Sequence, residues 1–382
     1  MSFFAEFRYL DEHEPRPGQL AHLVNARLRG VDDARIAYRA RDNWGDLPTE
    51  IVNDRLRRLG WPTRLTPAGA AAWGWHIRDD RAAYDPDHAA AWPRPRFALA
   101  GAAGGKPYRG ILWRYDLNSA YPATAMSIPI PDWRRERLCV SRAETERALA
   151  RGEIGVVRAS VRDAPPGLLC VTRWPHGDAD ANDAILTSVD VAALREAGAR
   201  VAVHAGVLAP GRSWDWYRAV GERLLALRRD DPAAGPLYKL AANGLVGRLA
   251  SDGHYELALR GNGETGVVRG RSITTHRVFY HSRVRPRSWI VAALVIATVR
   301  VRVWKLARDY DAAWHWIDAI AAPQPLPDEL VGSAPGMWRL ERVGESRILD
   351  WRGGIVAGER CMAVVPAPEA QRLVDAAADS AE

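Results

Sequence analysis

The sequence predicts an α+β protein, because segments with strand periodicity and segments with helical periodicity follow one another along much of its 382 residues. Strand-forming residues alternate in 111–117 and again in 153–161. Apolar residues recur at steps of three and four from Trp214 to Leu227, which is typical of one face of a helix. These patterns together favour a sheet that carries separate helices.

Size and composition narrow the class of protein. A mass of 42.2 kDa predicts two to three structural units, and 47% hydrophobic with 26% charged residues is ordinary for a globular chain. A net charge of +7 favours an acidic partner such as nucleic acid. The cysteines are far apart and form no C-x-x-C pair, so neither a zinc site nor a disulfide framework is indicated; they are Cys139, Cys170 and Cys361.

Two observations argue against a membrane segment. The N-terminal residues reach acidic side chains before any apolar run of signal-peptide length. The longest apolar run, 289–299, is shorter than the roughly 20 residues that span a bilayer, so we expect a buried helix there. We therefore expect a cytoplasmic protein with no membrane partner.

The segment 111–126 predicts a strand, a turn and a helix, with an acidic residue where the strand ends. Its first half predicts a strand, which ends at Asp116. Asn118, Ser119 and Pro122 suit a turn into a helix, since proline is tolerated in a helix's first turn. A carboxylate at the exit of a rigid strand is well placed to bind a metal ion.

Residues 186–208 predict a helix followed by a strand, and 214–249 predict a helical hairpin. The hairpin is interrupted by a group of turn formers, namely Asp230, Asp231, Pro232, Gly235 and Pro236. In the second helix, Lys239, Asn243 and Gly247 are spaced four apart and share one face, where glycine would let another backbone or a base approach closely.

The C-terminal half predicts three further elements. Segments 254–260 and 266–273 predict a β-hairpin, and 287–308 predicts an apolar helix. Segment 313–319 alternates like a strand, which would place Trp314, Trp316 and Asp318 on one side and His315 and Ile317 on the other.

Two motifs resemble those of the family B DNA polymerases, most closely the viral and protein-primed branch. Residues 116–122 (DLNSAYP) are similar to motif A, D-x-x-S-L-Y-P, and residues 239–247 (KLAANGLVG) are similar to motif B, K-x-x-x-N-S-x-Y-G. Motif B departs at Gly244 and Val246. The resemblance covers about residues 98–360 and implies a right-hand polymerase palm of antiparallel sheet and helices, helical-hairpin fingers and a vestigial thumb.

Motif C of that family, D-T-D-S-I, is similar to residues 316–320 (WIDAI) when Asp318 takes the place of the second, essential aspartate. A shift by two would put Asp318 at the dispensable first position and Ile320 at the ligand position, which predicts a dead enzyme. We prefer the first alignment, since 327–328 and 336–341 then fall where the family has p-D and L-G-x-W-K-x-E.

The resemblance implies a role for each matching residue. Asp116 and Asp318 would be the catalytic acids and, with Leu117, the metal ligands for two Mg²⁺ ions roughly 3.5 to 4 Å apart, with Mn²⁺ as a substitute. The implied nucleotide-binding residues are Lys239, Asn243, Ser119, Tyr121 and a basic helper, Arg223, Arg228 or Arg229. Tyr121 would exclude ribonucleotides. The implied DNA-binding residues are Gly104, Gly105, Gly247 and Arg352.

The sequence and the resemblance together predict five segments: an N-terminal domain of unknown role (1–97), palm (98–212), fingers (213–249), palm again (250–345) and a reduced thumb (346–382). The first segment lacks the D-x-E pattern of a proofreading exonuclease. The expected partners are a DNA primer–template, deoxynucleotides and a priming protein or processivity partner, in a bacterial or phage-infected cell. Two alternatives stay open: a catalytically dead, DNA-binding descendant of a polymerase, and untemplated nucleotide addition.

Overall fold

The computed structural model describes most of the chain after residue 101 and parts of the segment before it. The described residues are 7–9, 36–38, 49–60, 102–135, 137–168, 181–250, 254–259, 266–268, 271–273, 276–281, 289–350, 353–356 and 359–360. Arg352, Cys170 and Cys361 lie outside them. The chain forms two compact units, 1–85 with 216–289 and 86–215 with 290–382. Within the described ranges, no helix is long and apolar enough to cross a membrane.

The second unit is built on a seven-stranded antiparallel sheet with the order β19-β18-β17-β4-β16-β15-β3. Its strands are β3 (Ala102–Gly105), β4 (Tyr108–Leu117), β15 (Trp314–Ile317), β16 (Ala319–Ala322), β17 (Trp338–Asp350), β18 (Gly353–Val356) and β19 (Glu359–Arg360). β4 lies in the middle, between β16 and β17. Tyr115 and Leu117 of β4 are buried in the same core as Ile320 and Trp338.

β4 leads directly into helix α5 (Ala120–Ser127), so the predicted strand, turn and helix are confirmed. Ser119 makes the turn with a φ of 52°, in the left-handed region. Asn118 holds the turn, since its side-chain amide donates to the carbonyl oxygen of Ser333 over 2.5 Å and its backbone N–H donates to that of Met337 over 2.9 Å.

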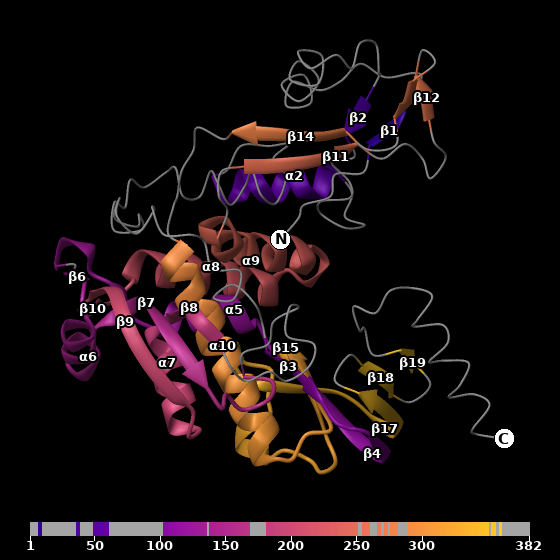
Figure 1. Ribbon diagram of the computed structural model, residues 1–382. Coiled ribbons are helices and arrows are strands. Elements are labelled where there is room, and N and C mark those ends of the chain that lie inside the picture. The colour runs from indigo at the N-terminus through magenta and orange to yellow at the C-terminus, as the bar shows by residue number, and fades with distance from the viewer. Residues whose placement is uncertain are drawn as a thin grey trace. The chain divides into compact units, whose positions relative to one another are not determined.

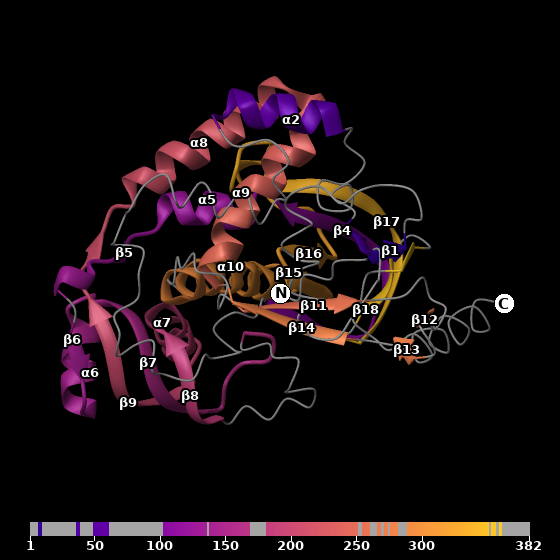
Figure 2. The same ribbon diagram turned by 90° about the horizontal axis from the view of Figure 1, so that it is seen from above.

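A second antiparallel sheet in this unit has the order β6-β9-β7-β8. It is formed by β6 (Arg137–Cys139), β7 (Ile154–Arg162), β8 (Ala181–Thr187) and β9 (Arg200–Ala209), with the helices α6 (Arg142–Ala150) and α7 (Ser188–Glu196). Figure 2 shows β9, β7 and β8 side by side, with α6 beside β9. Capping boxes start both helices, at Ser141 and Thr187. The predicted strand, helix and strand of this region are confirmed.

Helix α10 (Trp289–Asp309) connects the cores of the two sheets. Its residues Val299 and Val303 pack in the core of the seven-stranded sheet, and Trp304 packs in the core of the four-stranded sheet. The apolar helix predicted at 287–308 is therefore confirmed, and its uniform hydrophobicity reflects packing on more than one side. The unit also holds the short strands β5 (Ile130–Pro131) and β10 (Gly211–Arg212), which pair, and the 3₁₀ helices η3 (Trp133–Arg135) and η5 (Asp328–Leu330).

In the first unit, α8 (Asp215–Asp230), η4 (Pro232–Ala234) and α9 (Gly235–Ala250) form the predicted helical hairpin. Helix α2 (Thr49–Arg58) lies across the end of this hairpin where α8 passes into α9 (Figures 1 and 2). Val52 and Leu56, one helical turn apart on α2, are buried. The strands β1 (Phe7–Tyr9) and β2 (Ile36–Tyr38) pair with each other.

The β-hairpin predicted from 254–260 and 266–273 is wrong. β11 (His254–Leu259) pairs with β14 (His276–His281), and the intervening segment forms its own pair, β12 (Gly266–Val268) with β13 (Arg271–Ile273). Alternation showed that strands were present but did not determine their partners. The sequence places glycine at 261, 263, 266 and 270, so the chain could reverse at several points.

Candidate active site

Asp318 sits in a two-residue turn between β15 and β16. Trp316 pairs with Ala319, so only Ile317 and Asp318 connect the strands. Ile317 has a φ of 56°, which is uncommon for a β-branched residue. The prediction of one continuous strand over 313–319 is therefore wrong, because a turn with a left-handed residue reverses the chain one position before the acid.

The turn brings Asp318 to the end of β4 that carries Asp116. Asp116 is the register partner of Ala319. One residue further along, the backbone N–H of Leu117 donates to the carbonyl oxygen of Asp318 over 2.7 Å. Two acids that are distant in the sequence therefore lie near each other at the same end of the neighbouring strands β4 and β16: Asp116 in β4 and Asp318 in the turn that leads into β16.

Charged side chains surround Asp116 on the neighbouring strand β17. Arg339 is its register partner there, and the Arg339 guanidinium lies 3.7 Å from the Asp116 carboxylate. Arg339 also pairs with Glu341 over 3.1 Å, and Arg114 of β4 lies 3.3 Å from the same Glu341. This side of β4 and β17 therefore carries charges of alternating sign. The sequence did not predict Arg339 as a neighbour of Asp116.

Tyr121 follows the turn after β4. It lies in the first turn of α5 and packs against the core of the seven-stranded sheet. Burial raises the pKa of the Tyr121 hydroxyl, and the negative charge of Asp318 raises it further, whereas the positive charge of Arg300 opposes this. The Tyr121 hydroxyl is therefore within electrostatic reach of Asp318. Ser119, two residues earlier, donates from its hydroxyl to Asn118 over 3.4 Å.

The residues at this edge fit a divalent metal ion with oxygen ligands. Asp116 and Asp318 are half-buried acids, and Leu117, whose N–H is already bonded to Asp318, could add only its carbonyl oxygen. Across the described ranges, no group of three or more His, Cys, Asp or Glu side chains is arranged so that it could hold a metal ion. A site with two carboxylates suits Mg²⁺, which keeps several waters and completes its shell with substrate phosphates.

The three matching residues of motif B lie on the open face of α9. Lys239 is exposed, while Asn243 and Gly247 are partly exposed. The opposite face is buried and consists of Leu237, Tyr238, Ala241, Ala242, Leu245, Val246 and Leu249. At Gly247 an added Cβ would meet no atom of the described residues within 4 Å, so this face has room for a partner. Lys239 and Asn243 belong to the first unit, whereas Asp116 and Asp318 belong to the second.

The candidate basic helpers on α8 differ in their contacts. Arg223 donates over 3.4 Å to the carbonyl oxygen of Arg58, at the C-terminal end of α2. Arg229 pairs with its neighbour Asp230 over 2.9 Å. Arg228 is partly buried and packs near Gly235, at the start of α9. The contact between Arg223 and α2 was not predicted, because no sequence pattern linked the N-terminal segment to the hairpin.

The glycines expected to contact DNA lie in β3, where Gly104 and Gly105 pair with His315 and Trp314. A Cβ at Gly104 would lie 2.3 Å from Cε1 of the His315 ring, and one at Gly167 would lie 2.8 Å from it. His315 is buried, so these two glycines make room for its ring. Gly104 therefore has a packing role that the sequence did not suggest.

No family model and no curated protein matches the chain. Solved structures do match it. Phi29 DNA polymerase complexed with single-stranded DNA aligns with a TM-score of 0.57 and 15% identity over 81% of this chain and 59% of the polymerase. The same polymerase with primer–template DNA aligns with a TM-score of 0.58 and 15% identity over 82% of this chain and 59% of the polymerase. Its ternary complex with primer–template DNA and incoming nucleotide substrates aligns with a TM-score of 0.56 and 15% identity over 81% of this chain and 59% of the polymerase.

The chain therefore has the fold of the phi29 DNA polymerase, and the α+β fold class predicted from the sequence is confirmed. It spans about three-fifths of the length of that polymerase. At 15% identity the similarity shows the fold alone.

Proposed function

We propose that this protein is a template-directed DNA polymerase that adds deoxynucleotides to a primer 3′-hydroxyl, with Mg²⁺ and without proofreading. The observation that carries the proposal is the meeting of Asp116 and Asp318 at one edge of a polymerase-like sheet, fixed by the bond from Leu117 to Asp318. A fold hosts many functions, so these two acids support the proposed activity more strongly than the fold does.

The chain's own residues would act by positioning and by charge. Asp116 and Asp318, with the Leu117 carbonyl, would hold the divalent ions. Bound there, Mg²⁺ would supply activation of the hydroxyl and neutralisation of the phosphate charge. Phosphoryl transfer depends mainly on such placement of reactants and fixed charges, because the transition state spreads negative charge over the phosphate oxygens.

The nucleotide would be bound by residues of both motifs. Lys239, the exposed cation on the open face of α9, would contact the phosphates, with Asn243 beside it and Arg223 or Arg228 as helper. Tyr121, packed beside the metal-binding edge, would occupy the space next to the ribose 2′ carbon and so select deoxynucleotides. Gly247 and Arg352 would contact DNA, and a priming protein or processivity partner would complete the assembly.

A primer-extension assay with Mg²⁺ and a defined template tests this proposal. Asp116→Asn and Asp318→Asn should each reduce extension by about 10³-fold or more, because each removes a charged metal ligand worth several kcal/mol in the transition state. The matched control is Asp311→Asn, an exposed acid in the turn before β15 that pairs with Lys106. This control should extend primers normally.

Other outcomes would point to the alternatives. DNA binding without extension by the unaltered protein would indicate a polymerase-derived binding protein that has lost catalysis. Extension that ignores the template sequence would indicate untemplated addition. Extension that survives Asp318→Asn would contradict the assignment of Asp318 as a catalytic metal ligand.

A further inference from the structure

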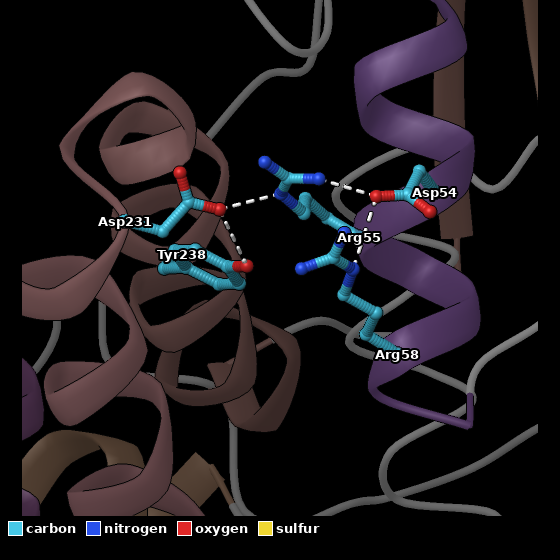
Figure 3. Close-up of polar contacts among 5 residues, drawn as sticks. All are labelled: Asp54, Arg55, Arg58, Asp231 and Tyr238. Atoms are coloured by element: carbon cyan, nitrogen blue, oxygen red, sulfur yellow. Dashed lines mark hydrogen bonds and ion pairs between the residues drawn. The ribbon is translucent and has the colours of Figure 1, made fainter.

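Helix α2 is joined to the hairpin of α8 and α9 by a partly buried polar contact, shown in Figure 3. Nε of Arg55 donates to Oδ2 of Asp231 over 2.5 Å, although the residues are far apart in the sequence. Arg55 is 19% exposed and Asp231 is 22% exposed, so the pair is largely shielded from water. A second N–H of Arg55 bonds to Asp54, which also accepts from Arg58 over 3.0 Å.

Asp231 directly follows α8 and caps η4, where the chain turns toward α9. Its N–H donates to the carbonyl oxygen of Leu227, and its own carbonyl oxygen accepts from Ala234 in η4. Its carboxylate also accepts from the hydroxyl of Tyr238 over 3.4 Å. The hydrogen bond from Arg55 is the main reason that the pKa of Asp231 lies below its usual value, so the acid is held in its charged form. Arg55 and Tyr238 therefore meet on one carboxylate (Figure 3).

Tyr238 is directly followed by Lys239 in the first part of α9. Tyr238 is almost fully buried, whereas Lys239 is exposed on the open face. Because neighbouring residues on a helix leave it about 100° apart, fixing the Tyr238 side chain fixes the direction in which Lys239 leaves the helix. A second tyrosine acts similarly further along, since Tyr217 of α8 donates to the carbonyl oxygen of Ala242, next to Asn243.

Apolar packing and a second polar contact support the same attachment. Val52 and Leu56 of α2 are buried, and Arg223 of α8 donates to the carbonyl oxygen of Arg58. The C-terminal end of a helix carries partial negative charge, which favours an arginine there. The segment before the palm thus contributes a helix to the fingers hairpin.

We propose that Arg55 is a positioning residue for nucleotide binding: through Asp231 and Tyr238 it sets the first turn of α9 and thereby the placement of Lys239. This gives part of the N-terminal segment a role that the sequence left open. The inference depends on the proposed function for its nucleotide, but the attachment of α2 to α9 can be measured without any catalysis.

The test compares four forms of the full chain: unaltered, Arg55→Ala, Arg55→Lys and Arg57→Ala. Lysine keeps the charge and one donor toward Asp231, so Arg55→Lys is the conservative rescue. Arg57 is exposed on the same helical turn of α2 and makes a matched control. The first measurement is amide hydrogen exchange in 235–243, and the second is steady-state incorporation of one deoxynucleotide.

Arg55→Ala should speed exchange in 235–243 by about tenfold, because local opening becomes easier when the turn loses its anchor. It should also raise the nucleotide KM by about tenfold with kcat changed less than about twofold, since a phosphate contact in the ground state and the transition state is weakened alike. Arg55→Lys should recover most of both changes, and Arg57→Ala should show neither.

Each contrary outcome has a defined meaning. Unchanged exchange in Arg55→Ala would overturn the proposal, because α2 would not control the start of α9. Faster exchange with an unchanged KM would also overturn it and leave α2 a purely stabilising helix. If the unaltered protein binds nucleotide but extends no primer, the proposed function fails, and the nucleotide Kd replaces KM as the readout for Arg55. If it does not bind nucleotide, both proposals fail.

Discussion

The guanidinium of Arg300 lies 2.5 Å from the carboxylate of Asp190, and both side chains are almost completely buried, at 2% and 0% exposure. Asp190 also accepts from the hydroxyl and the N–H of Thr187, which start α7. The pair therefore fastens α10 to α7 while Arg300 lies close enough to Tyr121 to affect its pKa. A buried charge that loses its partner cannot be compensated by water.

We predict that Asp190→Asn lowers the free energy of unfolding by about 3 to 5 kcal/mol, because it removes the negative charge that faces the buried Arg300 guanidinium. The matched control is Glu196→Gln, which breaks the exposed bridge between Lys305 of α10 and Glu196 of α7. That bridge joins the same two helices at the surface and should contribute less than about 1 kcal/mol. Urea unfolding of both variants measures the two losses in the free energy of unfolding. Equal losses in Asp190→Asn and Glu196→Gln would contradict the prediction.

The buried His315 ring predicts a pH-dependent stability. Burial lowers the pKa of His315 from 6.5 to about 4, although a hydrogen bond with the backbone of Gly167 opposes this. Because the unfolded chain takes up the proton more readily, stability is complete above pH 6.5 and falls as the pH drops toward 4. The loss should be about 3 kcal/mol. In His315→Gln this slope should flatten, whereas His204→Gln, an exposed histidine on β9, should keep it. Urea unfolding at several pH values measures the slope.

Gly247 should show opposite effects on stability and function. Alanine has room at this helical position and should raise the free energy of unfolding by about 0.5 to 1 kcal/mol. The same methyl group would narrow the open face of α9, so extension of a primed template should fall. Thermal unfolding tests the expected gain in stability, and primer extension tests the expected loss of activity. A variant that gains stability and keeps full extension would show that nothing approaches Gly247 closely.

Tyr121 should control the choice of sugar. Tyr121→Ala removes the ring beside the proposed metal site, and the preference for deoxynucleotides over ribonucleotides should fall by about 10²-fold, because a steric contact with the sugar would be lost. Tyr121→Phe keeps the ring and should keep the preference. The ratio of kcat/KM for the two nucleotides measures this. An unchanged ratio in Tyr121→Ala would remove Tyr121 from the sugar pocket.

Periodicity predicted the elements near the site well. The strand that ends at Asp116, the helical hairpin and the buried helix were all located to within a few residues, because each carries a long, regular apolar pattern. The spacing also placed Lys239, Asn243 and Gly247 on one face of α9, since residues four apart share a face, but only the structure shows that this face is open.

Contacts between distant segments could not be predicted in the same way. Asp231 is a turn former in the sequence, and nothing in its neighbourhood indicates that Arg55 will reach it. Gly104 was expected only as a DNA-binding residue, whereas the structure shows a strand residue kept small by the His315 ring. The turn at Ile317 was missed because a β-branched residue gives no signal for a left-handed conformation.

The hairpin of β15 and β16 is paired on both outer sides, by β3 and by β4. Such double pairing leaves the two-residue turn no freedom to slide, since a slip of one position would send every inward-facing side chain to the other face. Inserting or deleting a single residue between Trp314 and Ala322 would therefore not merely relocate the acid at the apex. Either the buried side chains of these strands would lose their places in the core, or Asp318 would lose its place beside β4.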